Sequence, residues 1–189
     1  VSCLMPGGLA GEPKATGREP SKPLRGPDCV YVPTPYDVVE QMLDLGAIRK
    51  TDVVFDLGCG DGRVVVQAAR KRGCRGVGFE IVPELVEAAR QNAHRNDVDH
   101  LVEIRQADLF QVDFQEATLV PMYLLPGMIV KLKPKLAELR PGTRIVAHDY
   151  SIEGIKPDKV VTMTSKETNV EHILYVYTVP LREDKSEDP

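Results

Sequence analysis

The sequence contains no tryptophan, no apolar run of 18 residues and little net charge. Its 189 residues, 42% hydrophobic and 28% charged, have the size and composition of one ordinary globular domain. Because no run is long enough for a transmembrane helix, we expect a soluble protein. We assign it to the cytoplasm, with removal of an upstream targeting segment as the alternative, since the sequence begins with Val. The net charge is −4, whereas a nucleic-acid-binding domain usually carries a basic stripe, so a nucleic-acid partner is not expected.

Cysteine is scarce, and its spacing indicates neither a metal site nor a redox dithiol. The four cysteines, at positions 3, 29, 59 and 74, form no CxxC pair and no Cys/His pair with zinc-binding spacing. We predict reduced thiols and no metal, with a disulfide between Cys3 and Cys29 as the alternative. Three scattered histidines, His94, His100 and His172, are predicted to be surface or packing residues.

The most informative stretch is rich in glycine. Residues 53–63 read VVFDLGCGDGR, an apolar run that ends in Asp56 and is followed by glycine at alternate positions. The run is typical of a buried strand, and the glycines let the backbone turn closely around a ligand. If a helix begins at Asp61, its free N–H groups face a negative group of that ligand. Dinucleotide-binding loops need G-x-G-x-x-G, with glycine where Arg63 stands, so the loop does not indicate NAD.

Two further acids follow the next two predicted strands. Glu80 ends the stretch GVGFE, roughly 20 residues after the glycine loop, where doubly wound folds place a carboxylate that binds ribose hydroxyls. Asp108 follows the apolar segment 101–104 and is expected beside an adenine ring at the carboxyl end of the third strand. Together the two acids indicate a cofactor that contains a nucleoside.

The motif DLGCGDG, with Glu80 and Asp108 downstream, resembles the class I S-adenosylmethionine-dependent methyltransferases. The resemblance implies S-adenosylmethionine as the cofactor, with Asp56 and the glycines near its methionine moiety, Glu80 on the ribose and Asp108 near the adenine. An acid beside backbone donors suits the ammonium and the carboxylate of that moiety. The full set of predicted cofactor contacts is Thr34, Asp56, Gly58, Cys59, Gly60, Gly62, Glu80, Ile81, Asp108 and Leu109.

Four further stretches are similar to one group of small bacterial and mitochondrial methyltransferases: YVPTP at 31–35, YLLP at 123–126, PGTRIVAHDY at 141–150 and YTVP at 177–180. Mitochondrial members of the group methylate lysines of the adenine nucleotide translocase and of the ATP synthase c subunit. The resemblance, which covers residues 31–180, therefore implies a protein-lysine N-methyltransferase.

The chain departs from the pattern of this group in three places. Glu80 stands where Asp is common, Met122 stands where Leu is expected, and IEGIKPD at 152–158 lacks a tryptophan. These departures leave the predicted cofactor site in place and bear on the choice of substrate.

Helix and strand patterns alternate along the chain and predict an α/β fold: a single doubly wound, Rossmann-like, seven-stranded sheet with an antiparallel last strand. We expect the domain to span residues 29–180, between an N-terminal tail (1–28) docked across the active-site mouth and a charged C-terminal tail (181–189). Helices are predicted at 35–46 behind a Thr34 cap, at 61–72, at 83–96 and at 132–139, where Pro134 interrupts or begins the helix. Strands are predicted at 53–56, 76–80, 101–104, 118–122, 143–148, 160–164 and 172–179.

Chemistry is expected at the carboxyl ends of the fourth and fifth strands, where open α/β sheets bind their ligands. Methyl transfer is an in-line displacement, which needs alignment and a neutral nucleophile, and aromatic walls favour the neutral form of a lysine amine. Tyr31, Tyr123 and Tyr150 are predicted to form such a channel, and Asp149 to hydrogen-bond the incoming amine. His148 is predicted to act as a base, with a structural role at the strand end as the alternative. The predicted catalytic residues are thus Tyr31, Tyr123, Asp149 and His148.

Two other functions stay open on the sequence. A small-molecule O-, N- or S-methyltransferase would use the same cofactor site, although a core of this size without a lid domain favours a macromolecular substrate. A non-catalytic S-adenosylmethionine-binding partner protein would leave Tyr123 and Asp149 without a role. The expected partner is therefore a protein that offers a lysine, or a small molecule.

Overall fold

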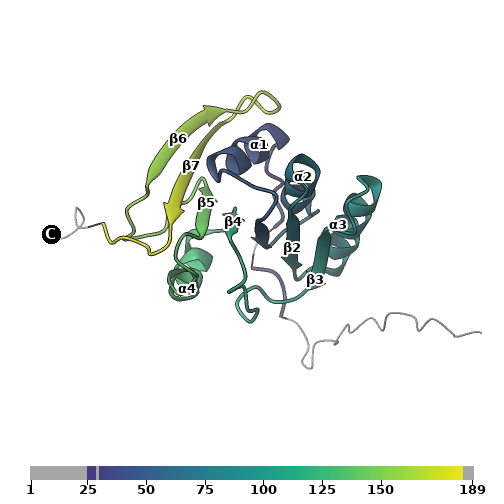
Figure 1. Cartoon of the computed structure of the whole chain (residues 1–189), viewed down its shortest axis with the longest axis horizontal. Helices are drawn as coiled ribbons and strands as arrows, with labels where there is room; N and C mark the ends of the chain where they lie inside the picture. The colour runs from purple at the N-terminus through teal and green to yellow at the C-terminus, as the bar shows by residue number, and fades with distance from the viewer. Residues whose placement is uncertain (1–24, 29, 185–189) are drawn as a thin grey trace, which may run out of the picture.

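A seven-stranded sheet forms the centre of the structure (Figure 1). The computed structural model describes residues 25–28 and 30–184. The strand order is β3-β2-β1-β4-β5-β7-β6; β1 to β5 are parallel, and β7 is antiparallel to both of its neighbours. This arrangement confirms the predicted doubly wound sheet and its antiparallel last strand. The strands are β1 (Val53–Leu57), β2 (Arg75–Glu80), β3 (Val102–Gln106), β4 (Leu119–Met122), β5 (Arg144–His148), β6 (Lys159–Thr164) and β7 (Glu171–Thr178).

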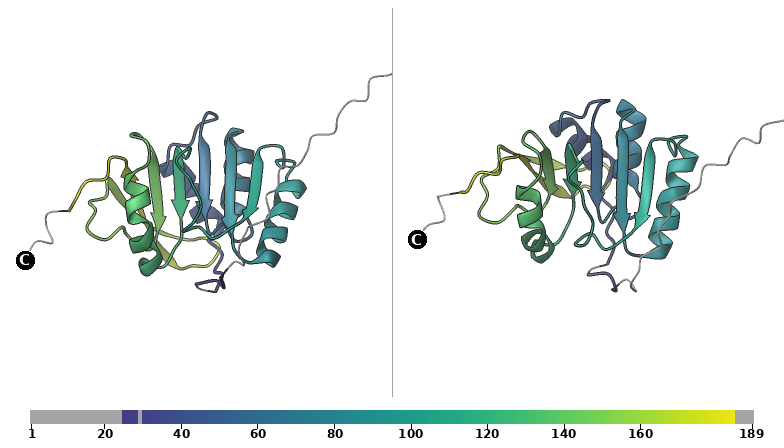
Figure 2. Two further views of the ribbon diagram at one scale, coloured as in Figure 1. Left: turned by 90° about the horizontal axis from the view of Figure 1, so that it is seen from below. Right: turned by 60° about the horizontal axis from the view of Figure 1, so that its bottom comes forward.

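Helices cover both faces of the sheet. On one face lie α1 (Tyr36–Leu45), α2 (Arg63–Arg72) and α3 (Pro83–Arg95), and on the other lies α4 (Pro126–Ala137). Each face has its own apolar core, because successive residues of a buried strand point to opposite sides. Figure 2 shows the strands side by side, with the purple N-terminal segment below the arrowheads of the parallel strands β1 to β5. The carboxyl ends of the strands and the N-terminal segment therefore lie together.

Two details of the predicted helices are wrong. Thr34 does not cap α1: the helix begins at Tyr36, its N-cap is Pro35, and no side chain caps it. The Thr34 hydroxyl lies instead 3.3 Å from the Nδ1 atom of His148. Pro134 neither interrupts nor begins α4, which starts eight residues earlier at Pro126 and runs through Pro134. A helix tolerates such a proline when tertiary packing offsets the lost hydrogen bond, and α4 buries Leu132 and Leu136 on either side of it.

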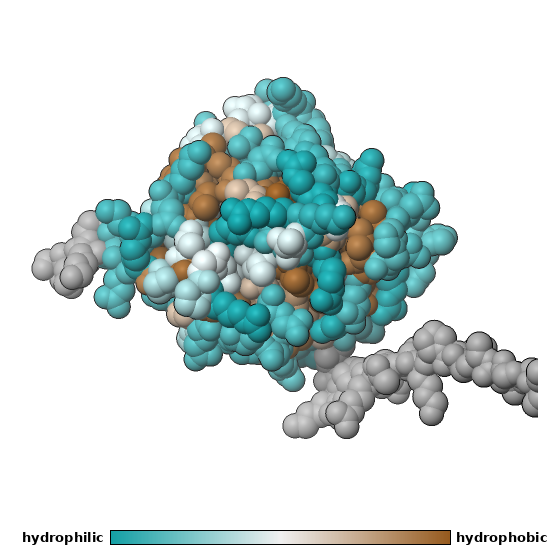
Figure 3. Space-filling view, viewed as in Figure 1, coloured by the Kyte–Doolittle hydropathy of each residue, from teal (hydrophilic) through white to brown (hydrophobic). Residues whose placement is uncertain are grey.

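The surface in the orientation of Figure 1 is mostly hydrophilic, with apolar side chains in scattered patches (Figure 3). None of the helices in the described part of the chain has the length and apolar character to cross a membrane. The predicted tail at residues 1–28 lies outside the described residues except for 25–28, and of the tail at 181–189 only 181–184 are described.

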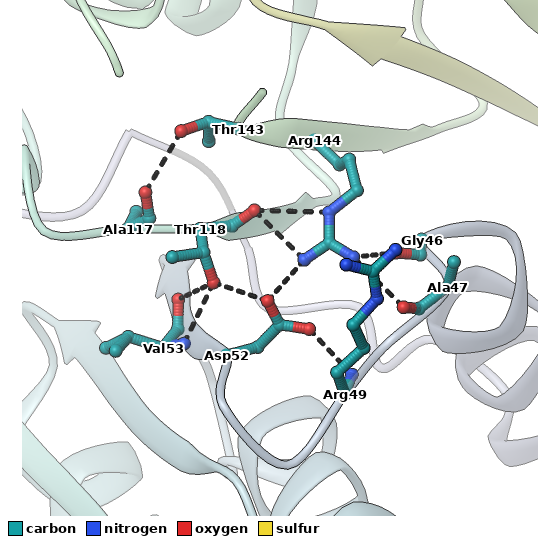
Figure 4. A network of polar contacts seen from close by, with 9 residues as sticks. All are labelled: Gly46, Ala47, Arg49, Asp52, Val53, Ala117, Thr118, Thr143 and Arg144. Atoms are coloured by element: carbon teal, nitrogen blue, oxygen red, sulfur yellow. Dashed lines mark hydrogen bonds and ion pairs between the residues drawn. The ribbon is translucent and has the colours of Figure 1, made fainter. Parts of the chain in front are cut away.

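A polar network ties the amino ends of the central strands together, at the edge of the sheet opposite their carboxyl ends (Figure 4). Asp52 Oδ1 accepts hydrogen bonds from the Thr118 hydroxyl at 2.7 Å and from Arg144 Nη2 at 2.5 Å. Asp52 Oδ2 accepts the backbone N–H of Arg49 at 2.6 Å, and Arg144 Nη1 also donates to the carbonyl of Gly46 at 2.8 Å. Because Asp52 is 6% exposed, its charge depends on these donors.

Replacing Arg144 by methionine is expected to lower the free energy of unfolding by about 3 kcal/mol, because it leaves the buried Asp52 carboxylate without its cation. The measurement is urea unfolding. Arg182→Met is the matched control, since Arg182 pairs with Asp158 at the surface, where an ion pair is worth at most about 1 kcal/mol. Equal losses in the two variants would contradict the role given to the network.

Candidate active site

A cavity of about 250 Å³ opens at the carboxyl ends of the central strands. Its wall comes from the glycine loop after β1, from the residues that follow β2 and β4, and from the N-terminal segment, including Arg25 and Tyr31. β1 has β2 on one side and β4 on the other, so the cavity lies where the strand order reverses. Open α/β sheets bind their ligands at this point. The cavity is therefore the candidate active site, in the predicted position.

The glycine loop turns sharply beneath the Tyr31 ring. Gly58, Gly60 and Gly62 have φ values of 82°, 53° and 74°, in the left-handed region that favours glycine. A Cβ atom on Gly60 would lie 2.1 Å from the ring of Tyr31. The N–H of Gly58 donates to the carbonyl of Phe79 in β2 at 2.8 Å. Both backbone conformation and packing therefore require glycine at position 60.

Glu80, the last residue of β2, holds this loop in place. Its Oε2 atom accepts the N–H of Gly60 at 2.9 Å, and its Oε1 atom accepts those of Ile81 and Val82 at 2.7 and 3.0 Å. A carboxylate has about four acceptor sites, so capacity remains for a ligand. Glu80 lines the cavity in a fixed orientation, as a carboxylate that binds ribose hydroxyls requires.

Asp56, in β1, is an unpartnered acid in the cavity wall. It is 5% exposed, and no donor in the described part of the chain hydrogen-bonds to its carboxylate. Burial raises the pKa of Asp56 to about 7, and the nearby carboxylates of Glu80 and Asp61 add to the shift. A cationic group in the cavity would favour the ionised form, so Asp56 suits the ammonium of a bound ligand.

Asp108 anchors the N-terminal segment and is not part of the cavity wall. Arg25 donates from Nε and Nη2 to the two carboxylate oxygens, at 2.7 and 3.1 Å, and the N–H of Phe110 donates at 3.0 Å. The hydrogen bond from Arg25 holds the pKa of Asp108 below its usual range. The neighbouring Leu109 does line the cavity, as predicted for a residue near the adenine. An adenine contact by Asp108 itself stays a prediction.

The other predicted cofactor residues divide into two sets. Those that line the cavity are Thr34, Cys59 and Ile81. Cys59 is the small residue expected beside the loop: it is 5% exposed, and burial raises the pKa of its thiol. Gly60 and Gly62 shape the loop from behind the wall. At Gly62 an added Cβ would lie 2.9 Å from the side chain of Ala89 in α3.

Three tyrosines also line the cavity: Tyr31, Tyr123 and Tyr150. The rings of Tyr123 and Tyr150 stack, with centroids 6.3 Å apart and planes at 16°. The Tyr31 hydroxyl is buried and makes no hydrogen bond within the described residues. Burial raises the pKa of Tyr31 to about 12 and also raises that of Tyr123. Both hydroxyls are therefore neutral at pH 7, and that of Tyr123 can accept a hydrogen bond from an amine.

His148 lies behind this tyrosine wall and does not line the cavity. It is 1% exposed, and its ring centroid lies 4.0 Å from that of Tyr123. Its Nδ1 atom lies 3.3 Å from the Thr34 hydroxyl, and its Nε2 atom lies 2.9 Å from Nδ1 of His172. Burial lowers the pKa of His148 to about 4. This geometry favours the structural role over the base: His148 supports Tyr123 from behind.

Asp149 and His172 complete a buried cluster with His148. Asp149 adopts a left-handed backbone conformation, with φ 60°, and its Oδ1 atom accepts the N–H of Ile173 at 3.0 Å. Its Oδ2 atom lies 3.3 Å from Nδ1 of His172, which is 7% exposed. Of the two positions predicted for His172, at the surface or in the packing, the structure has the second. The alternating pattern of β7 could have indicated its burial, since His172 lies on the same side of the strand as the buried Leu174.

The comparison with known proteins decides the family. The sequence profile of the ANTKMT methyltransferase domain matches residues 56–159, more than half of the chain. A protein-lysine N-methyltransferase of Saccharolobus islandicus is 41% identical over 155 residues, which are 81% of this chain and 95% of that protein. The chain belongs to this methyltransferase family.

Two further relatives differ in length and in described substrate. A lysine N-methyltransferase of the ATP synthase c subunit from Xenopus laevis is 35% identical over 69% of this chain, which spans 57% of that protein. The crystal structure of an RNA methyltransferase from Salinibacter ruber, in complex with S-adenosyl-L-homocysteine, is 47% identical, with a TM-score of 0.75. The match covers 84% of this chain and all of the Salinibacter ruber chain. The methyltransferase fold predicted from the sequence is thus confirmed.

The family match places most of the site of this methyltransferase within one continuous block of sequence. Residues 56–159 include the glycine loop, Glu80, Tyr123 and the segment 148–150. Tyr31 and His172, which pack against the loop and against His148, lie outside the matched range.

Proposed function

We propose that this methyltransferase transfers the methyl group of S-adenosylmethionine to a lysine side chain of a protein. The observation that carries the proposal is a single cavity with an unpartnered buried acid, Asp56, at the glycine loop and a wall of neutral tyrosines beside it. The acid at the glycine loop suits the charged end of the cofactor, and the tyrosine wall suits an amine. The lysine N-methyltransferases among the relatives support the same assignment.

The residues around the glycine loop fit S-adenosylmethionine. When bound, the cofactor supplies an electrophilic methyl group on its sulfonium. Asp56 pairs with the ammonium of the methionine moiety, and its burial makes that pairing strong. Glu80 accepts from the ribose hydroxyls while it holds the loop, and Leu109 provides an apolar wall for the adenine. These residues would bind and orient the cofactor in the cavity that the tyrosines also line.

The tyrosine wall acts on the acceptor amine. An apolar surrounding lowers the pKa of a lysine from its reference value near 10.4, which favours the neutral, nucleophilic form. The Tyr123 hydroxyl would accept a hydrogen bond from the amine and orient it, and the ring of Tyr31 would form part of the apolar wall around it. Alignment is the main catalytic contribution, because the reaction disperses positive charge and needs no oxyanion hole.

RNA is the competing substrate class, since the relative of known structure from Salinibacter ruber is described as an RNA methyltransferase. The charge of the chain favours protein: 28 acidic against 24 basic residues give a net charge of −4, without the excess of basic residues that phosphate binding requires. Exposed apolar residues at the cavity, Val30, Val32 and Leu125, also favour a substrate with apolar side chains around the accepting group.

The experiment is incubation of the purified protein with methyl-labelled S-adenosylmethionine and a cell extract, followed by fractionation into protein, RNA and small molecules. Label in protein that is sensitive to protease and resistant to ribonuclease is the expected result. Label that ribonuclease releases would move the substrate to RNA, and label in the small-molecule fraction would favour the small-molecule alternative. A parallel incubation with Asp56→Asn measures the labelling that does not depend on this cavity.

Replacing Glu80 by alanine is expected to weaken cofactor binding about 10- to 100-fold, which corresponds to the 1 to 3 kcal/mol of a lost charged acceptor. The variant loses the ribose contact and also frees the N–H of Gly60 that orders the loop. Calorimetric titration with S-adenosylmethionine measures the effect. Glu103→Ala is the control, because Glu103 is an exposed glutamate of the neighbouring strand β3. An unchanged dissociation constant in Glu80→Ala would place the ribose elsewhere.

A further inference from the structure

The side chains of His148, Asp149 and His172 bring three lone-pair atoms together behind the tyrosine wall. Nε2 of His148 lies 2.9 Å from Nδ1 of His172, and both nitrogens lie 3.3 Å from Oδ2 of Asp149. His148 ends β5, Asp149 follows it, and His172 lies in β7, so the triangle spans two antiparallel strands. Two imidazoles and one carboxylate form a ligand set that divalent transition metals prefer.

Hydrogen bonds between the three side chains are the alternative to a bound ion. The contact of 2.9 Å between the two ring nitrogens requires one of them to donate to the other, which places a hydrogen on the line between them. Asp149 Oδ2 then faces both rings at 3.3 Å, longer than the roughly 2.7–2.9 Å of a charge-assisted hydrogen bond. Without a cation, a single ring N–H of His172 is shared between the facing nitrogen and this oxygen, so the carboxylate receives only a long contact from the two rings. A cation within the triangle would bind all three atoms at once.

The dimensions suit a metal ion. Zinc binds imidazole nitrogen and carboxylate oxygen at about 2.0–2.2 Å, which separates neighbouring ligand atoms by about 3.0–3.5 Å. The observed separations of 2.9 and 3.3 Å need only small adjustments to fit. The side chain of Asp149 is 27% exposed, which leaves a solvent path for a water molecule as the fourth ligand.

Neighbouring groups already orient two of the three ligands. The Thr34 hydroxyl contacts the outer ring nitrogen of His148 at 3.3 Å, and the N–H of Ile173 donates to the outer oxygen of Asp149 at 3.0 Å. Such contacts fix tautomer and orientation around metal sites. The outer nitrogen of His172 is buried and has no partner within the described residues, so this third ligand has no such orienting contact.

We propose that His148, Asp149 and His172 bind a divalent transition-metal ion, and that the bound ion ties β5 to β7 behind Tyr123. The sequence offered no sign of this site, because the ligands are a neighbouring pair and a residue 23 positions later that pairing of antiparallel strands brings together. None of the three ligands lines the cavity, so the ion is separate from the methyl-transfer site and the proposal does not depend on the identity of the substrate.

The test uses the tag-free full-length protein, freed of metal with a chelator and titrated with Zn²⁺ by calorimetry. One equivalent should bind and raise the melting temperature. His172→Gln and Asp149→Asn should each weaken binding about 100-fold or more, since each removes a ligand. His94→Gln should bind as the wild type does, because His94 and Asp99 form an exposed pair elsewhere on the surface. A wild type that binds no ion, or ligand variants that bind as well as the wild type, would overturn the proposal.

A ligand variant that fails to fold is replaced by a measurement on the wild type with Co²⁺. Nitrogen and oxygen ligands give only weak visible absorption, whereas thiolate ligands add an intense near-ultraviolet band. The chain has four cysteines, of which Cys59 and Cys74 are buried free thiols, so the band reports a competing site. Weak visible bands saturating at one equivalent support the proposed ligands. A thiolate band at that equivalent assigns the ion to cysteine and overturns the proposal.

Discussion

Asp56→Asn is expected to weaken binding of S-adenosylmethionine about 100-fold, because the buried carboxylate that pairs with the cofactor ammonium becomes neutral. The exchange keeps the size of the side chain, so the loop and the strand keep their packing. Calorimetric titration gives the dissociation constant, and Asp97→Asn, at an exposed turn after α3, controls for the change in net charge. Equal affinities for the wild type and Asp56→Asn would mean that the ammonium binds elsewhere.

The same residue should make cofactor affinity depend on pH. With the pKa of Asp56 at about 7 in the cofactor-free protein, the carboxylate is mostly protonated at pH 6 and mostly ionised at pH 8. Since only the ionised form pairs with the ammonium, affinity should fall about tenfold between pH 8 and pH 6 in the wild type and stay nearly constant in Asp56→Asn. Titrations at the two pH values measure the difference.

Stability without cofactor should change in the opposite direction. The folded-state pKa of Asp56, about 7, lies above the usual 3.8, so folding takes up a proton between these values. The contribution to stability is fully present below about pH 4 and is lost as the pH rises through 7, by at most about 4 kcal/mol. Urea unfolding of the wild type and of Asp56→Asn at pH 5 and pH 8 isolates this term from other titrating groups. The free energy of unfolding of Asp56→Asn should exceed that of the wild type by more at pH 8 than at pH 5.

Tyr123→Phe is expected to lower the rate of methyl transfer about 100-fold while cofactor affinity stays nearly unchanged, because the hydroxyl positions the amine and does not contact the glycine loop. The ring remains, so its packing on Tyr150 and His148 is kept. Single-turnover methylation with saturating cofactor measures the rate. Tyr175→Phe in β7 is the control, since Tyr175 does not line the cavity. A wild-type rate in Tyr123→Phe would show that this hydroxyl does not align the substrate.

The cofactor half of the site could be predicted because its signals are local in the sequence. The acids Asp56 and Glu80 lie at the carboxyl ends of buried strands, and the glycine loop follows the first of these strands directly. Parallel strands bring their carboxyl ends to one edge of the sheet. Apolar runs and alternation in the sequence are also local signals, and they located every strand of the sheet to within about two residues. Once the strand order is that of a doubly wound sheet, these residues have to meet.

The rest could not be predicted because it depends on contacts between distant segments. Arg25 meets Asp108 across 83 residues, and His148 meets His172 through the pairing of β5 with β7. No periodicity marks either pair. The cap assigned to Thr34 failed for a related reason: its hydroxyl contacts a side chain 114 residues away, which the local helix signal does not contain.

The central claim, methyl transfer from this cavity to a lysine of a protein, is tested most directly by mapping the methyl group in the product. The wild type is incubated with trideuteromethyl-labelled S-adenosylmethionine and a protein extract, and the proteins are digested and sequenced by mass spectrometry. The predicted result is the heavy methyl group on the Nζ atom of lysine in particular proteins, absent with Asp56→Asn. Heavy methyl groups on another side chain, or on no protein while the enzyme still consumes cofactor, would contradict the account.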